Sequence, residues 1–215
     1  MQQVIEKALS NLLQNFEITY AGRTDAGVHA KHQVLSVVTD EKISESFKTS
    51  FNALVGKHIY IKQIKIAKES FHPRYDAIER TYKYFVNTPS NFEPYNLGYS
   101  YLINEELDIS NLNFYAESFL GVNNFTNFSK LRKDQEPTRE ITASKWTRNS
   151  QFFIYTISGN SFLHNMVRSL VGIQLACQSG KINKASIDSA LKKPQKERFN
   201  YVAPPEGLYL WKIKY

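Results

Sequence analysis

The sequence predicts an α+β protein with two similar-sized lobes, in which mostly antiparallel sheets are flanked by helices. Segments with apolar residues at helical spacing alternate with short β-branched or alternating segments, and both halves of the chain contain both kinds. Two strand-like segments, 140–148 and 151–158, are joined by Asn149 and Ser150, which is typical of an antiparallel hairpin. With 215 residues, of which 42% are apolar, the chain is long enough to bury a core in one large domain or two small ones.

The first lobe is expected to span residues 1–88. Apolar residues at helical spacing predict helices, and β-branched or alternating residues predict strands. The expected elements of this lobe are a helix at 2–15, an extended piece at 16–20, a strand at 33–38, a helix at 43–55 that Gly56 ends, a strand with a bulge at 59–66 and a strand at 79–87. The last strand alternates, with Tyr82, Tyr84 and Val86 on one face and Thr81, Lys83 and Phe85 on the other.

The second lobe is expected to span residues 89–215, because the segment 87–95 contains prolines and polar turn residues that break regular structure. Its expected elements are a helix capped by Ser110 and ended by Gly121, the hairpin at 140–158, a long helix at 162–179, a short helix at 185–191 and a final strand at 208–214.

Composition favours an anionic partner. The formal net charge of +7 and the pI near 9.3 make nucleic acid the leading candidate. The chain has no apolar run long enough for a membrane span and no signal-peptide pattern at its start, and a single cysteine, Cys177, indicates a reducing compartment, so we expect a cytoplasmic protein.

Neither a metal nor a cofactor is expected. One cysteine cannot form a cysteine-rich metal site, and His29, His32 and His72 are too scattered to suggest metal-ligand spacing. The phosphate-binding patterns GxxxxGK and GxGxxG are both missing from the sequence.

Two charged residues stand out by their surroundings. Asp25 lies in AGRTDAGVHA, residues 21–30, where small side chains let the backbone bend and a large ligand approach. Asp25 either forms a turn or is a functional carboxylate. Arg168 is the only charged residue in the segment 162–180, and it either extends to solvent or grips a carboxylate with two hydrogen bonds. If the two pair, Asp25 stays ionised although partly desolvated, and becomes a nucleophile or a base.

A group of aromatic and basic residues surrounds the strand at 79–87. Tyr82 and Tyr84 are either core residues or a surface on which bases stack. Arg74, Arg80 and Lys83 lie in the same region of the sequence. Interleaved basic and aromatic side chains bind flipped or single-stranded bases through phosphate contacts and stacking, so we interpret these residues as substrate-binding.

Four segments together resemble the tRNA pseudouridine synthase A family. They are GRTDAGVHA at 22–30, FHPRYDAIERTYKY at 71–84, ISGNSFLHNMVRSLVG at 157–172 and APPEGLYL at 203–210. The resemblance covers nearly the whole chain and implies an active cleft between two lobes. It implies isomerisation of uridine to pseudouridine on the 3′ side of the tRNA anticodon stem-loop, by a homodimer whose subunits both contact the tRNA, without a cofactor.

The same resemblance implies roles for individual residues. Asp25 corresponds to the catalytic aspartate, Tyr82 to the active-site tyrosine and Arg168 to the active-site basic residue. Leu208 corresponds to a leucine that packs against the target base, and Arg23 to an arginine that helps displace this base. A base within a stem must be flipped out before it can react, and the small residues around Asp25 would leave room for it.

Two departures from the family pattern leave alternatives open. The chain begins about where the family's first strand, a YDGxxFxGWQxQ-like segment, would end, so we expect that strand to be missing. Asn123 and Asn124 stand where the family usually has His-Asp. One alternative is therefore a catalytically impaired tRNA-binding or chaperone-like protein. Another is an enzyme of nucleotides or sugars that uses Asp25 in glycoside chemistry, which normally needs two carboxylates.

Overall fold

The chain forms two compact units in the computed structural model, which describes residues 1–194 and 198–215. Residues 1–21 and 34–76 form the first unit, and residues 22–33 and 77–215 form the second. This division differs from the expected lobes 1–88 and 89–215, since the second unit is much the larger and includes the loop that carries Asp25. The α+β class is confirmed.

The first unit is a two-helix, two-strand assembly with its own small core. Its elements are α1 (Gln2–Ser10), β1 (Glu17–Tyr20), β3 (Leu35–Val38) and α2 (Phe47–Leu54), and β1 pairs antiparallel with β3. The buried residues are Ile5, Ala8, Leu9, Leu13, Phe51 and Val55. The helical stripe predicted at 2–15 is thus the face that packs inward, although the helix itself ends at Ser10.

The prediction of a strand at 59–66 is wrong. No strand is assigned to these residues; Ile64 and Ile66 are exposed, and the Asn52 side chain bonds both the N–H and the C=O of Ile61. The spacing of the isoleucines predicted a strand, but a strand also needs a partner strand to accept and donate its backbone hydrogen bonds. Here the side-chain amide of Asn52 bonds the backbone groups of Ile61 instead.

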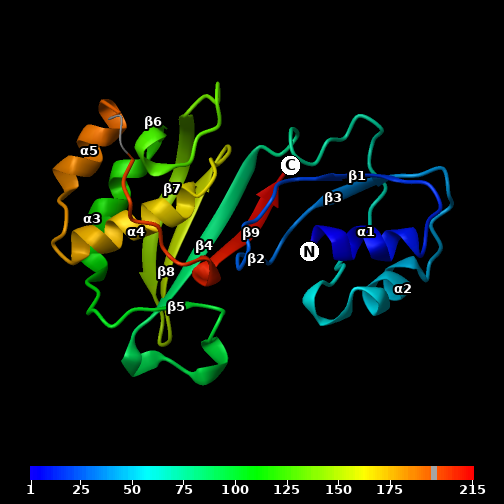
Figure 1. The fold of residues 1–215 in the computed structure, drawn as a ribbon, viewed down its shortest axis with the longest axis horizontal. Helices are drawn as coiled ribbons and strands as arrows, with labels where there is room; N and C mark the ends of the chain where they lie inside the picture. Colours follow the sequence, from blue (N-terminus) through cyan, green and yellow to red (C-terminus); the bar gives the residue numbers. More distant parts are fainter. Residues whose placement is uncertain (195–197) are drawn as a thin grey trace. The chain divides into compact units, whose positions relative to one another are not determined.

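The second unit contains a seven-stranded sheet in the order β2-β9-β4-β8-β7-β6, with β5 paired to β4 (Figure 1). The strands are β2 (His29–Ala30), β4 (Glu79–Asn87), β5 (Tyr101–Leu102), β6 (Gly121–Asn124), β7 (Thr138–Arg148), β8 (Phe153–Gly159) and β9 (Leu208–Lys214). The pairs β2–β9 and β4–β5 are parallel, and the others are antiparallel. The predicted strand at 79–87, the hairpin and the final strand are confirmed, whereas β2, β5 and β6 were not expected.

Helices α3 (Ile109–Ala116) and α4 (Met166–Gln178) lie on one face of this sheet, and α5 (Lys184–Lys192) follows α4 (Figure 1). The core between helices and sheet includes the fully buried Trp146, Tyr84, Tyr155, Phe119, Phe125, Phe128 and Ile157. Within residues 1–194 and 198–215, no helix combines the length and the apolar character needed to cross a bilayer.

Three local expectations need correction. The cap of α3 is Asp108, whose carboxylate accepts from the N–H groups of Ser110 and Asn111, rather than Ser110 itself. Helix α4 begins at Met166 rather than at 162, because Asn165 adopts a left-handed conformation with φ 62°. The segment 87–95 is not a linker, because it lies within the second unit, where Asn87 is fully buried and its side chain donates to the Gln151 carbonyl in the β7–β8 turn.

Candidate functional site

The loop that carries Asp25 is held against the C-terminal segment of the second unit. The Val28 N–H donates to the Asp25 carbonyl at 3.1 Å, which closes a turn. Gly27 has φ +81°, and a Cβ built on it would lie 2.9 Å from Pro205 Cγ. Glycine is therefore required both for the backbone conformation and for the close approach. Directly after the turn, β2 pairs with β9, so the loop has a fixed position beside the sheet.

The start of α4 supplies the cation that faces this loop. The Arg168 side chain is 17% exposed, and its Nε donates to the Ala203 carbonyl at 2.7 Å, while the Ala203 N–H donates to the Arg168 carbonyl at 3.0 Å. The segment around Ala203 can lie this close because α4 has Gly172 at the crossing, where a Cβ would be 2.7 Å from the Tyr201 carbonyl oxygen. The close packing of these two backbone segments thus fixes the position of the Arg168 guanidinium.

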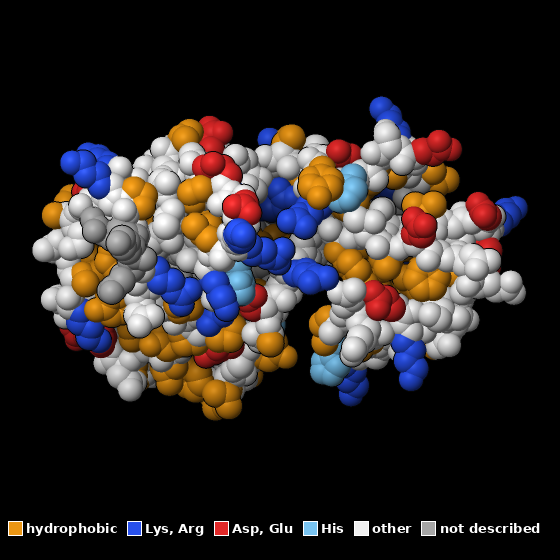
Figure 2. Space-filling view, turned by 45° about the horizontal axis from the view of Figure 1, so that its top comes forward, with side chains coloured by type: hydrophobic (Ala, Val, Ile, Leu, Met, Phe, Trp, Pro, Cys, Tyr) orange, Lys and Arg blue, Asp and Glu red, His pale blue; other side chains and the backbone are white. Residues whose placement is uncertain are grey.

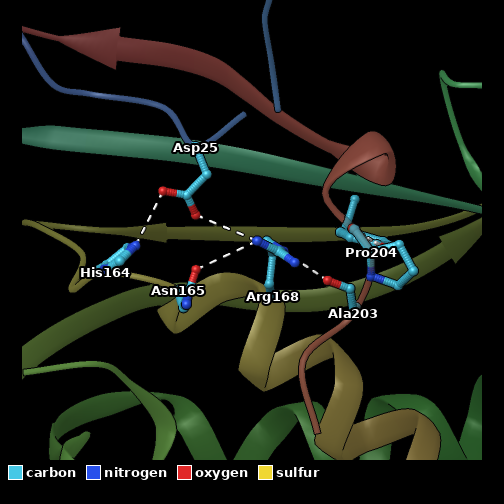
Figure 3. Close-up of polar contacts among 7 residues, drawn as sticks. Asp25, His164, Asn165, Arg168, Ala203 and Pro204 are labelled. Carbon is cyan, nitrogen blue, oxygen red and sulfur yellow. Dashed lines mark hydrogen bonds and ion pairs between the residues drawn. The ribbon is translucent and has the colours of Figure 1, made fainter. Parts of the chain in front are cut away.

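The Asp25 carboxylate has a different partner on each oxygen (Figure 3). Oδ2 lies 3.5 Å from Arg168 Nη1, and Oδ1 lies 3.3 Å from His164 Nε2. The predicted pairing of Asp25 with Arg168 is present, but Arg168 offers one nitrogen rather than the expected two-pronged grip, because Nε is bonded to Ala203. Both residues belong to the second unit, so the pair does not join the two units.

The Asp25 side chain is 34% exposed, which makes it partly desolvated and still accessible. An ionised carboxylate in such a position can attack an electrophilic carbon or accept a proton. The side chains that contact the Asp25 carboxylate are His164 and Arg168, neither of which is a carboxylate. The alternative of glycoside chemistry, which normally needs two carboxylates, is therefore not supported by these contacts.

Tyr82 lies on the same face of β4 as the core residue Tyr84, and its ring meets Phe162 edge-on with centroids 5.0 Å apart. Burial raises the pKa of Tyr82 to about 12; the Arg80 cation opposes this shift and the Asp25 carboxylate adds to it. The hydroxyl is therefore neutral near pH 7. A neutral phenol can donate a hydrogen bond or stack on a base, but it is not by itself the base that removes a proton.

The other predicted residues on the sheet are not all brought to Asp25. Lys83 lies on the opposite face of β4 from Tyr82, with its ammonium 4.4 Å from the Trp211 ring centre. Arg80 is partly buried, and its Nη1 donates to the Asn160 carbonyl at 2.8 Å, so it stabilises the turn after β8. Leu208 is 6% exposed and belongs to the core cluster.

Two predicted arginines are exposed. Arg23 lies two residues before Asp25 in the same loop, whereas Arg74 belongs to the first unit, where its guanidinium approaches the Tyr75 ring. The departures at Asn123 and Asn124 are structural, because their side chains bond to neighbouring backbone groups at the ends of β6.

The sequence reasoning overlooked His164. This residue precedes Arg168 by four positions, but it lies before α4, which begins at Met166 after the left-handed Asn165, so helical spacing does not place the two side chains together. No pattern in the sequence indicated its position beside Asp25. The structure describes no cluster of three or more His, Cys, Asp or Glu side chains suited to a metal ion within residues 1–194 and 198–215.

Comparison with known proteins gives the class. A family model described as tRNA pseudouridine synthase matches residues 115–215, which include β7, β8, α4 and β9. The part of the chain that carries these strands and Arg168 therefore matches the class of tRNA pseudouridine synthases.

Full-length similarity narrows this class. Over 220 residues the chain is 33% identical to tRNA pseudouridine synthase A of Bacillus subtilis (strain 168), covering all of this chain and 89% of the relative. It is 34% identical over 219 residues to the protein of the same name from Borreliella afzelii (strain PKo), with the same coverage. The chain belongs to the tRNA pseudouridine synthase A family.

Proposed function

We propose that the chain is an isomerase that converts uridine to pseudouridine in tRNA, with Asp25 as its catalytic carboxylate. The observation that carries this proposal is the partly exposed Asp25 carboxylate, held on one oxygen by the mostly buried cation of Arg168, in a chain of this family.

The reaction rearranges bonds without net gain or loss of atoms. The C1′–N1 bond of the target uridine breaks with help from Asp25, the uracil turns, and a C1′–C5 bond forms. The proton on C5 is then lost and N1 gains one, so that neither an oxidant nor a cofactor is needed. Tyr82, neutral near pH 7, would stack on the uracil and hold it during the turn.

Access to the base requires that it leave its stack. Arg23, exposed in the Asp25 loop, would fill the vacated space or hold a neighbouring phosphate. Figure 2 shows Lys and Arg side chains at the surface, and the net charge of +7 is as expected for a protein that binds a polyanion. We infer the anticodon stem-loop as the target region, a homodimer as the active form and the cytoplasm as its compartment.

Roles for the remaining predicted residues follow from their contacts. Arg74 and Lys83 would contact RNA phosphates, and Arg80 would support the turn after β8. Leu208, which is buried in the core, would support the site by excluding water from the core beneath the site.

The test uses tRNA that carries tritium at C5 of uracil, because isomerisation releases this tritium to water. Asp25→Asn should lower release by at least about 1,000-fold, since it removes the nucleophile or base, while tRNA binding persists. Asp188→Asn, which alters a partly exposed carboxylate that pairs with Lys184 in α5, is the matched control and should retain turnover. Full turnover by Asp25→Asn would refute the assignment. Binding without any release by the wild-type chain would support the alternative of an RNA-binding protein.

A further inference from the structure

We propose that His164 is a positioning residue that fixes the orientation of the Asp25 carboxylate, a role that rests on the proposed function. Its Nε2 lies 3.3 Å from Asp25 Oδ1, on the carboxylate oxygen that Arg168 does not contact. Figure 3 shows the two partners approaching the carboxylate from different sides.

Arg168 alone leaves this carboxylate incompletely fixed. Its Nε is bonded to the Ala203 carbonyl at 2.7 Å, and its Nη1 is shared between Asp25 Oδ2 and Asn165 Oδ1, each at 3.5 Å. One long contact to one oxygen restrains the distance between the groups but permits the carboxylate to rotate about its Cβ–Cγ bond. A second donor on the other oxygen removes that freedom.

His164 is held in place by its backbone rather than by burial. Its carbonyl accepts the Lys130 N–H at 3.0 Å, and it lies in the turn that the Met166 N–H closes on the Leu163 carbonyl at 3.1 Å. The next residue, Asn165, has the left-handed conformation that begins α4. The imidazole itself is 47% exposed, so it contributes little to the core. The consequence of removing it should therefore be felt mainly at Asp25.

The contact also indicates which ring nitrogen carries a proton. A carboxylate oxygen only accepts hydrogen bonds, so Nε2 must carry a proton for the contact to be favourable. With both oxygens engaged, the carboxylate plane is set before substrate arrives. Such preorganisation matters for rate, because displacement of a catalytic group by about 1 Å reduces turnover by roughly 100-fold.

The kinetic test compares two substitutions in the tritium-release assay. His164→Leu, which cannot donate, should lower kcat by about 10- to 100-fold and leave KM for tRNA within about 2-fold. His164→Gln, whose amide can donate from nearly the same place, should retain kcat within about 3-fold of wild type. Unchanged kcat in His164→Leu, equal losses in both variants, or a raised KM at constant kcat would each overturn the proposal.

A second measurement is independent of turnover. In the protein labelled with ¹⁵N at histidine, the NMR chemical shifts of the two His164 ring nitrogens should report a fixed Nε2–H form in wild type and a mixture of tautomers in Asp25→Ala. Equal shifts in the two proteins would refute the contact. If wild type shows the fixed form but releases no tritium, the proposed function fails while the positioning contact stands.

Discussion

Gly172 lies where helix α4 crosses the segment that carries Ala203. Its replacement by alanine has two effects on stability, which are comparable in size and opposite in sign. Alanine stabilises a helix interior over glycine by about 0.8–1.0 kcal/mol. Against this, the new Cβ would lie 2.7 Å from the Tyr201 carbonyl oxygen, 2.8 Å from its carbonyl carbon and 3.0 Å from the Ala203 nitrogen. All three neighbours are backbone atoms, so relief requires the whole segment to move.

The clash should outweigh the gain in helix propensity. Overpacking costs about 1–3 kcal/mol, and a shift of Ala203 also weakens the Arg168 Nε hydrogen bond, in which a charged donor contributes roughly 1.5–3 kcal/mol. We expect Gly172→Ala to lower the free energy of unfolding by about 1–3 kcal/mol. Turnover should fall as well, because the cation facing Asp25 loses its support.

Urea unfolding followed by circular dichroism measures the first effect, and tritium release measures the second. Ser189→Ala is the control, because Ser189 is exposed within α5 and the substitution reports the gain in helix propensity without a backbone clash. A Gly172→Ala protein that is more stable than wild type, by as much as helix propensity alone predicts, would refute the close approach.

Three further predictions follow from the second unit. Arg168→Lys should lower turnover by at least about 100-fold, since one ammonium nitrogen cannot take the places of both Nε, which bonds Ala203, and Nη1, which faces Asp25; wild-type kcat in the tritium assay would contradict this geometry. Gln174→Leu should lower the free energy of unfolding in urea by about 1–3 kcal/mol, because it leaves the buried Trp146 Nε1–H without its acceptor. Gln178→Leu is its control and should be neutral or stabilising, since the buried Gln178 Oε1 has no hydrogen-bond partner among the residues described. Burial raises the pKa of Tyr82 and Tyr209 from 10.0 to about 12, so urea midpoints should fall between pH 10 and 12, where only the unfolded chain has lost these protons; a midpoint that rises there would be inconsistent with the burial.

Much of the secondary structure could be predicted because its cause is local. The alternation at 79–87 and the run at 208–214 gave β4 and β9 with their observed bounds. The failures have physical reasons. Strand β2 has only two residues and exists because β9 is beside it, and the isoleucines at 59–66 have strand-like spacing without a partner strand.

The candidate site was predicted in part. Asp25 was identifiable by the small residues around it, and Arg168 as the one charge on an apolar helix. His164 was not, because it lies in the turn before α4, where no helical spacing relates it to Arg168. Lys83 was interpreted as substrate-binding from its neighbours in sequence, yet strand alternation directs it to the face opposite Tyr82.

The sequence by itself predicted the class of fold, the family and the pairing of Asp25 with Arg168, because residue type and spacing are properties of the chain alone. Tertiary structure decided which unit holds the Asp25 loop, which oxygen each partner contacts and how the guanidinium divides its donors. These depend on backbone approaches at Gly27 and Gly172 between segments far apart in sequence, and no local pattern encodes such distances.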